Sequence, residues 1–121
     1  MNSKQLLVTA ALLGMVCVAL GAFGAHALKE QLATYHRTDT FELAVRYQFY
    51  HTLVLLFLGL QKDIDPKIPA YLFLGGIALF SGSLYFLALT NSTVLVLVTP
   101  IGGVLLLAGW GAVAWHFWKQ K

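Results

Sequence analysis

The sequence is poor in charged residues and in cysteine. Charged side chains make up only 11% of the 121 residues, and 59% of the residues are hydrophobic. A soluble globular domain has roughly 25% charged residues. So few charged groups cannot cover a soluble protein of this size, and lipid must surround most of the chain. The single cysteine, Cys17, excludes an internal disulfide and a zinc site built on cysteines.

Basic runs and catalytic motifs are also absent. The net charge is +3, with no cluster of lysines or arginines, so nucleic acid is not an expected partner. The sequence contains no HExxH motif, no paired-carboxylate constellation, no nucleophile with a base and an orienting group, and no glycine loop for phosphate. We therefore expect no metal, no cofactor and no enzymatic activity.

Long apolar stretches dominate the chain. A bilayer core of ~30 Å requires about 20 apolar residues per helix, and four stretches qualify: 6–25, 41–60, 68–89 and 94–118. Only helices and closed barrels satisfy their backbones in lipid. The connections 61–67 and 90–93 are short, which makes consecutive helices antiparallel neighbours. The sequence predicts an all-α fold, an integral membrane four-helix bundle in which residues 1–121 form a single domain.

The connection after the first stretch has a helical pattern of its own. Leu28, Leu32 and Tyr35 recur at i, i+4 and i+7 with polar residues between them. This pattern predicts a short amphipathic helix over about 28–36, lying along the membrane interface. Asp39, followed three residues later by Glu42, resembles a capping box that opens the second span.

The basic residues outside the spans predict the orientation. Cytoplasmic loops carry an excess of lysine and arginine, and five such residues lie on the side of the termini against two on the other side. We therefore expect both termini in the cytoplasm. The five are Lys4, Lys62, Lys67, Lys119 and Lys121, and the two are Lys29 and Arg37.

Glu42 and Arg46 are the charged residues inside a predicted span that invite a function. They are four residues apart and share a helix face, and an ionisable residue within a span is a functional hypothesis by default. Three interpretations remain open. Arg46 reaches the nearby water, or Glu42 and backbone carbonyls satisfy it as a purely structural pair, or the two line a pocket for an anionic head group or small anion.

All four spans place polar or backbone-exposing residues at a similar depth in the outer half. We therefore predict a polar cluster centred on Arg46, either ligand-binding or structural. Small residues and a proline are expected to let helices approach closely and to open space. The predicted cluster is His26, Glu42, Arg46, His51, Ser83 and Thr99, and the predicted helix-packing residues are Gly21, Gly24, Pro100, Gly102 and Gly103.

His51 lies near the middle of its predicted span, on the face of Tyr47. A buried histidine at this depth acts as a proton relay or ligand, or it forms a hydrogen bond with a tyrosine or serine of a neighbouring helix. A bis-histidine haem is not expected, because His26 and His116 lie at other depths.

Four segments together resemble a known family. They are GAFGAHALK (21–29), TFELAVRYQFYHTLVLL (40–56), FSGSLYFLALT (80–90) and TPIGG (99–103). The chain resembles, over nearly its whole length, the small bacterial inner-membrane family called domain of unknown function 423. The resemblance implies four transmembrane helices in the inner (plasma) membrane and brings no established activity, substrate or catalytic residue.

Two classes of function are consistent with these features. The first is a non-enzymatic interaction or scaffold protein with a polar pocket in the outer leaflet around Glu42 and Arg46. The second is an oligomeric transporter or channel, or a binder of a small anion or lipid head group. A single bundle is too thin to enclose a hydrated path, so transport requires an oligomer. The expected partners are membrane lipids and either further copies of the chain or another membrane protein.

Overall fold

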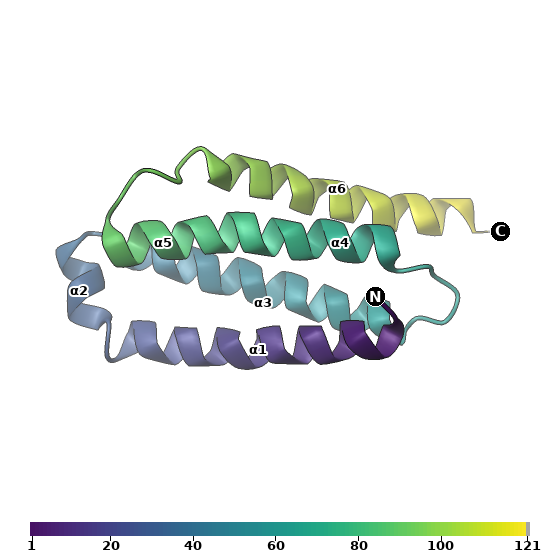
Figure 1. Ribbon diagram of the computed structural model, residues 1–121, viewed down its shortest axis with the longest axis horizontal. Coiled ribbons are helices and arrows are strands. Elements are labelled where there is room, and N and C mark those ends of the chain that lie inside the picture. Colours follow the sequence, from purple (N-terminus) through teal and green to yellow (C-terminus); the bar gives the residue numbers. More distant parts are fainter. Residues whose placement is uncertain (121) are drawn as a thin grey trace.

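The computed structural model describes residues 1–120, and that part of the chain contains helices and no strand (Figure 1). Four helical rods are long and apolar enough to cross a membrane: Ser3–Ala25, Thr38–Leu60, Lys67–Thr90 and Val98–Lys119. The predicted all-α membrane bundle is therefore confirmed. The elements are α1 (Ser3–Ala25), α2 (Lys29–Thr34), α3 (Thr38–Leu60), α4 (Lys67–Gly76), η1 (Ile77–Ser81), α5 (Gly82–Thr90) and α6 (Val98–Lys119).

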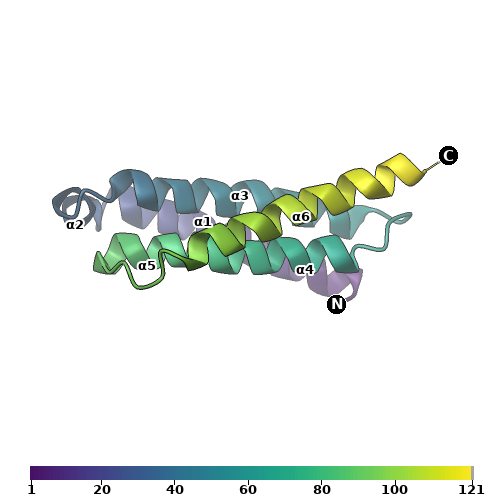
Figure 2. The same cartoon turned by 90° about the horizontal axis from the view of Figure 1, so that it is seen from above.

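The second and third spans form the centre of the bundle, and α1 and α6 flank them (Figures 1 and 2). α1 packs along α3, α3 packs along η1 and α5, and α6 packs along α4 and η1. Because α1 and α6 each have one main neighbour, much of their surface faces outward. Met15 and Val18 of α1 are 64% and 67% exposed, and Leu107 of α6 is 72% exposed. The N-terminus and the C-terminal end of α6 lie at the same end of the bundle (Figure 1).

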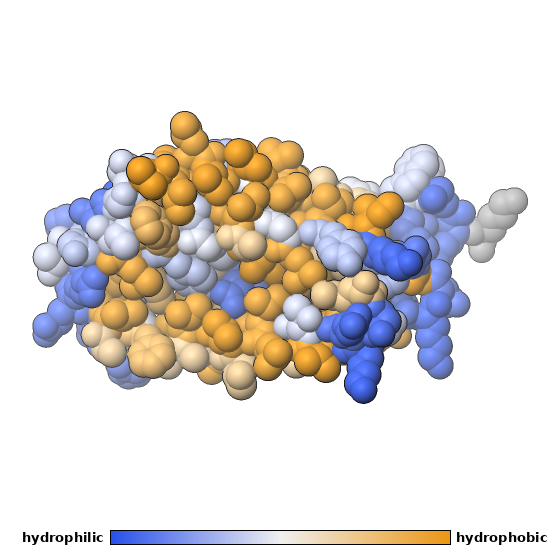
Figure 3. Space-filling model, in the orientation of Figure 1, coloured by the Kyte–Doolittle hydropathy of each residue, from blue (hydrophilic) through white to orange (hydrophobic). Residues whose placement is uncertain are grey.

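The surface has the distribution of polarity that a bilayer requires. Apolar residues cover much of the middle of the face seen in Figure 3, and hydrophilic residues gather at its two ends. An apolar belt between polar ends matches a hydrocarbon core between two head-group regions.

Two buried apolar clusters hold the helices together. The larger joins all four spans in the half of the bundle nearer the termini. The smaller lies at the opposite end, where Leu32 of α2 packs with Phe41 and Ala88 and so fastens the short helix onto α3 and α5. The larger cluster comprises Leu6, Ala10, Leu55, Leu58, Ile64, Ala70, Phe73, Ile77 and Leu106.

The interfacial helix α2 spans Lys29–Thr34, within the expected 28–36. Gln31 Nε2 donates a hydrogen bond to the carbonyl of Leu89 at 2.9 Å, and Arg37 Nε donates one to Asn91 Oδ1 at 3.1 Å. These two bonds fasten the connection between α1 and α3 to the end of α5.

The predicted capping box of the second span is wrong. α3 begins at Thr38 after Arg37, which makes no side-chain capping bond, so Asp39 lies inside the first turn. There its carboxylate favours the positive end of the helix dipole without capping it. A reciprocal capping box does exist in α1, where Asn2 and Gln5 bond to each other's backbone N–H groups at 3.0 and 2.8 Å.

The last span starts later than the apolar run predicts. α5 ends on Asn91 in the left-handed conformation (φ 54°), and α6 begins at Val98, whereas the hydrophobic stretch begins at 94. Pro100 therefore lies in the first turn of α6, where its missing N–H has no partner to lose. The interior of α6 therefore contains no proline.

A π-helical turn interrupts the third span at its centre. Residues Ile77–Ser81 form η1 between α4 and α5. Gly102 of α6 packs directly on its backbone, because a Cβ atom at Gly102 would lie 2.7 Å from Phe80 Cα and 2.8 Å from the carbonyl carbon of Leu79. The third and fourth spans thus touch main chain to main chain.

Candidate functional site

A cavity of about 250 Å³ opens between α1 and α3 at the end of the bundle that carries α2. It contains both charged residues of the predicted cluster that lie inside a span, and both glycines expected to open space beside them. Its walls are Gly21, Gly24, Ala25, Leu32, Thr38, Phe41, Glu42, Val45 and Arg46.

The cavity exists because α1 carries small residues here. At Gly24 a Cβ atom would lie 2.7 Å from Phe41 Cδ1, so a larger residue would displace the ring. At Gly21 a Cβ atom would lie 3.6 Å from Val45 Cγ1, which is ordinary contact. Gly24 is therefore required for the close approach of α1 and α3, whereas Gly21 leaves space.

Glu42 and Arg46 are both exposed. Within residues 1–120, neither side chain forms a hydrogen bond or an ion pair with another residue. The purely structural interpretation required Glu42 and nearby carbonyls to satisfy the guanidinium, and this geometry is not formed. The two charges face a cavity with their hydrogen-bonding capacity unused.

A second hollow, of about 310 Å³, continues from the cavity along the same pair of helices. It shares Gly21, Val45 and Arg46 with the cavity, and its other walls are almost entirely apolar. Val18, Phe49 and Tyr50 are 67%, 41% and 51% exposed on its lipid-facing side. Its walls are Cys17, Val18, Gly21, Ala22, Val45, Arg46, Phe49 and Tyr50.

The remaining members of the predicted cluster lie elsewhere. Ser83 and Thr99 pair with each other across α5 and α6, with their hydroxyl oxygens 2.5 Å apart, and neither lines the cavity. Ser83 also donates to the carbonyl of Phe80 at 3.0 Å. His26 is exposed at the C-terminal end of α1 and is not part of the cavity wall. The structure thus divides the cluster that depth alone had grouped around Arg46.

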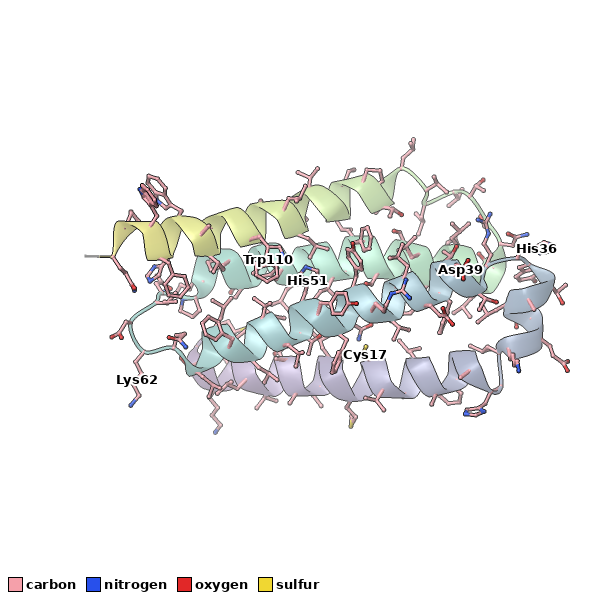
Figure 4. The ribbon with its side chains drawn as sticks, turned by 180° about the vertical axis from the view of Figure 1, so that it is seen from behind. Cys17, His36, Asp39, His51, Lys62 and Trp110 are labelled. Atoms are coloured by element: carbon pink, nitrogen blue, oxygen red, sulfur yellow. The ribbon has the colours of Figure 1, made fainter. Side chains whose placement is uncertain are left out.

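His51 belongs to a third location, between α3 and α6. Trp110 Nε1 donates a hydrogen bond to His51 Nε2 at 3.1 Å, and Figure 4 shows the two side chains facing each other. Since Nε2 accepts, the neutral ring carries its proton on Nδ1, which donates to the carbonyl of Tyr47 at 2.6 Å. Both ring nitrogens are satisfied within the protein, and the sequence had pointed to a tyrosine or serine as the partner.

A groove of about 640 Å³ lies beside this pair. Tyr47, which lines the groove, stacks on Phe80 with ring centroids 4.8 Å apart. The groove is lined by Tyr47, Tyr50, His51, Pro100, Gly103, Val104, Leu106, Leu107 and Trp110.

Gln48 is the centre of the buried polar contacts, and sequence reasoning missed this role. Its side chain is 3% exposed. Its amide nitrogen donates to the carbonyl of Leu13 at 2.9 Å, and its amide oxygen accepts from Tyr85 at 2.7 Å. Gln48 thereby joins α1, α3 and α5. A neutral amide side chain within a membrane span was the available signal.

Two further bonds bind α3 to its neighbours in the same layer. Ser81 Oγ donates to the carbonyl of Ala44 at 2.8 Å, and Cys17 Sγ donates to the carbonyl of Val45 at 3.2 Å. In Figure 4 Cys17 lies on the side of α1 that faces α3. Among the described residues, no buried side-chain nitrogen or oxygen lacks a partner, and no group of three or more His, Cys, Asp or Glu residues is placed to hold a metal ion.

Four helices that are long and apolar enough to cross a membrane, joined by a buried polar layer, define a small multi-pass helical membrane protein. The family model described as "Protein of unknown function (DUF423)" matches residues 20–103, which include every residue of the cavity. The chain belongs to this family.

Similar chains occur in distant bacteria. The chain is 44% identical over 110 residues to a UPF0382 membrane protein of Staphylococcus epidermidis, covering 88% of this chain and 89% of that protein. It is 42% identical to a UPF0382 membrane protein of Haemophilus influenzae, covering 100% and 98%. It is also 42% identical to the UPF0382 inner membrane protein YgdD of Escherichia coli K12, covering 91% and 86%. No solved structure matches the chain.

Proposed function

We propose that the protein is a non-enzymatic membrane protein that binds a phospholipid, with the head group in the cavity between α1 and α3. The observation that carries this proposal is the continuity of two hollows. The cavity that contains the charged side chains of Glu42 and Arg46 shares Gly21, Val45 and Arg46 with the apolar hollow on the lipid-facing side of the same helices. A polar head joined to an apolar chain has this shape.

Arginine is suited to the phosphate of such a head group. Its guanidinium is charged at any relevant pH and presents a planar fork of donors that matches phosphate oxygens. In residues 1–120 no acidic side chain occupies the Arg46 fork. The donors that a phosphate requires are therefore available in the cavity.

The apolar hollow beside the cavity favours a lipid over a free anion as the ligand. A soluble anion would gain only the contacts around Arg46, whereas a lipid would also bury an acyl chain against Val18 and Phe49. Burial of each CH₂ group contributes about 0.8 kcal/mol relative to water, although a lipid that exchanges from the bilayer gains less because its chain is already in hydrocarbon.

The basic residues support a cytoplasmic position for both termini, which puts the cavity in the outer leaflet. A reporter active only in the cytoplasm, fused after Lys121, is expected to give signal. A reporter that is active only on the outer side of the membrane, fused at the same point, is expected to give no signal. The opposite result would show that the cavity lies in the inner leaflet, and it would not contradict the proposal that the cavity binds a lipid.

Binding is tested with the purified protein in mild detergent by native mass spectrometry. Phosphatidylethanolamine and phosphatidylglycerol should form complexes, whereas diacylglycerol with the same acyl chains, which has no phosphate, should bind at least tenfold more weakly. Arg46→Gln should abolish this difference. Lys29→Gln is the matched control, because Lys29 is exposed at the same end of the molecule and does not line the cavity. The proposal is refuted if the unaltered protein binds all three lipids equally well and Arg46→Gln binds each of them as tightly as the unaltered protein does.

A further inference from the structure

We infer that the cavity selects a zwitterionic aminophospholipid, phosphatidylethanolamine, with the phosphate on Arg46 and the primary ammonium on Glu42. The inference rests on the proposed function and specifies the head group that the same cavity accepts. It follows from the sign, the order and the hydrogen-bonding state of the charges that face the cavity.

The cavity wall carries one negatively charged side chain and one positively charged side chain. Glu42 and Arg46 line it one helical turn apart, both exposed and both without a partner among residues 1–120. A head group with only a negative charge would satisfy Arg46 and meet the like charge of Glu42. A zwitterion satisfies both, so the cavity is complementary in charge to a ligand of zero net charge.

The partial charges of the two helix ends at the cavity also cancel each other. Ala25, the last residue of α1, and Thr38, the first residue of α3, both line the cavity. The C-terminal end of a helix carries roughly half a negative charge and the N-terminal end roughly half a positive charge. The two ends lie at one opening and offset each other, so the backbone adds no preference for an ion of either sign.

The order of the two side chains along α3 matches the order of charges in the lipid. α3 starts at the head-group end of the span, and Arg46 lies about 6 Å deeper than Glu42 at 1.5 Å per residue. In phosphatidylethanolamine the phosphate joins the glycerol and is the deeper charge, and the amine lies beyond it by two carbon atoms. The phosphate thus reaches Arg46 and the amine reaches Glu42, while the acyl chain lies along the apolar hollow.

The type of cation is set by the chemistry of Glu42. A primary ammonium donates N–H bonds to a carboxylate, whereas a quaternary ammonium has no N–H and is recognised by a cage of exposed aromatic faces. Phe41 is the aromatic residue in the cavity wall, and it is 1% exposed. The cavity therefore fits ethanolamine better than choline. A serine head group would bring a second carboxylate toward Glu42.

Native mass spectrometry with four lipids of identical acyl chains tests the inference. The unaltered protein should bind phosphatidylethanolamine about tenfold more tightly than phosphatidylglycerol, phosphatidylcholine or phosphatidylserine, the value of one charge-assisted hydrogen bond. Glu42→Gln should reduce this preference to less than threefold by weakening phosphatidylethanolamine alone. Asp39→Asn is the matched control, because it removes an exposed acid from the first turn of α3 outside the cavity wall.

The failures of the two proposals are distinguishable. If Arg46→Gln weakens all four lipids but the unaltered protein shows no preference, or Glu42→Gln leaves the preference intact, the ethanolamine inference is refuted and phospholipid binding stands. Equal binding of phosphatidylcholine and phosphatidylethanolamine would refute the N–H contact with Glu42. If Arg46→Gln changes the binding of none of the four lipids, both proposals fail. The thermal midpoint of each variant shows whether it remains folded.

Discussion

Arg46 and Gln48 are two residues apart on α3 and differ in almost everything else. Gln48 is 3% exposed and has hydrogen-bond partners on α1 and α5. Arg46 is exposed and has no protein partner in the described residues. Two residues along an α-helix turn the side chain by about 200°, which places them on opposite faces. One face of α3 therefore holds the bundle together, and the other leaves its charge available to something outside the chain.

The glycines repeat the contrast. Gly102 packs on the backbone of η1, so any side chain there meets main-chain atoms. A Cβ atom at Gly21 would make only ordinary contact with Val45, and beyond it the cavity is open. Close packing and open space thus come from the same residue type, and only the neighbouring helix distinguishes them.

The largest expected effect is at the backbone contact between the third and fourth spans. Gly102→Val should destabilise the protein by about 3 kcal/mol, because α6 must move away from η1 to make room. SDS unfolding titration in mixed micelles measures this loss. Gly111→Val on the same helix is the control, since nothing lies within 4 Å of a Cβ atom there. Equal midpoints for the two variants would show that the contact is not close.

Gln48→Leu should cost about 1–3 kcal/mol in the same titration, because the partly buried Tyr85 hydroxyl loses its acceptor. Hydrogen bonds within membrane proteins average about 0.6 kcal/mol, which favours the lower part of this range. Tyr85→Phe combined with Gln48→Leu should recover part of the loss, since no donor is then left unpaired. Strict additivity of the two changes would mean that these side chains do not interact.

The sequence predicted the spans well, and it identified the cavity residues better than the buried network. Long apolar runs determine where helices lie, and Glu42, Arg46, Gly21 and Gly24 stood out by charge or by size. Gln48 and Tyr85 did not, because a neutral polar side chain in a span is compatible with several environments. Their role depends on which helices are neighbours, and that is a tertiary property.

Depth along a helix was the other source of error. Ser83 and Thr99 were grouped with Arg46 because they lie at a similar level, but level says nothing about which face a side chain occupies. The π-turn at Ile77–Ser81 adds to the difficulty. A π-turn inserts one residue into the helical repeat and rotates the residues after it by about 100° relative to a regular helix. No pattern in the sequence predicts this rotation. The rotation helps to turn Ser83 toward Thr99.

Gly21→Leu should separate binding from stability. The new side chain would fill part of the cavity, so phosphatidylethanolamine binding should fall about tenfold, while the free energy of unfolding should change by about 0.5 kcal/mol or less. Ala19→Leu is the matched control, because Ala19 is exposed on α1 outside both hollows. A loss of stability as large as that of Gln48→Leu would show that Gly21 is a packing residue and that the space beside it is not available to a ligand.

The smallest effect on stability is expected at Arg46. Arg46→Leu removes an exposed charge that has no protein partner, so the unfolding midpoint in detergent without added lipid should remain close to that of the unaltered protein. Added phosphatidylethanolamine should stabilise the unaltered protein, because a ligand that binds only the folded state raises its stability by mass action, and should not stabilise the variant. The double variant Glu42→Leu with Arg46→Leu should behave like Arg46→Leu alone in the absence of lipid. If Arg46→Leu instead costs more than about 1 kcal/mol and the second substitution restores it, then Glu42 and Arg46 form a structural pair. In that case the contrast between the two faces of α3 disappears.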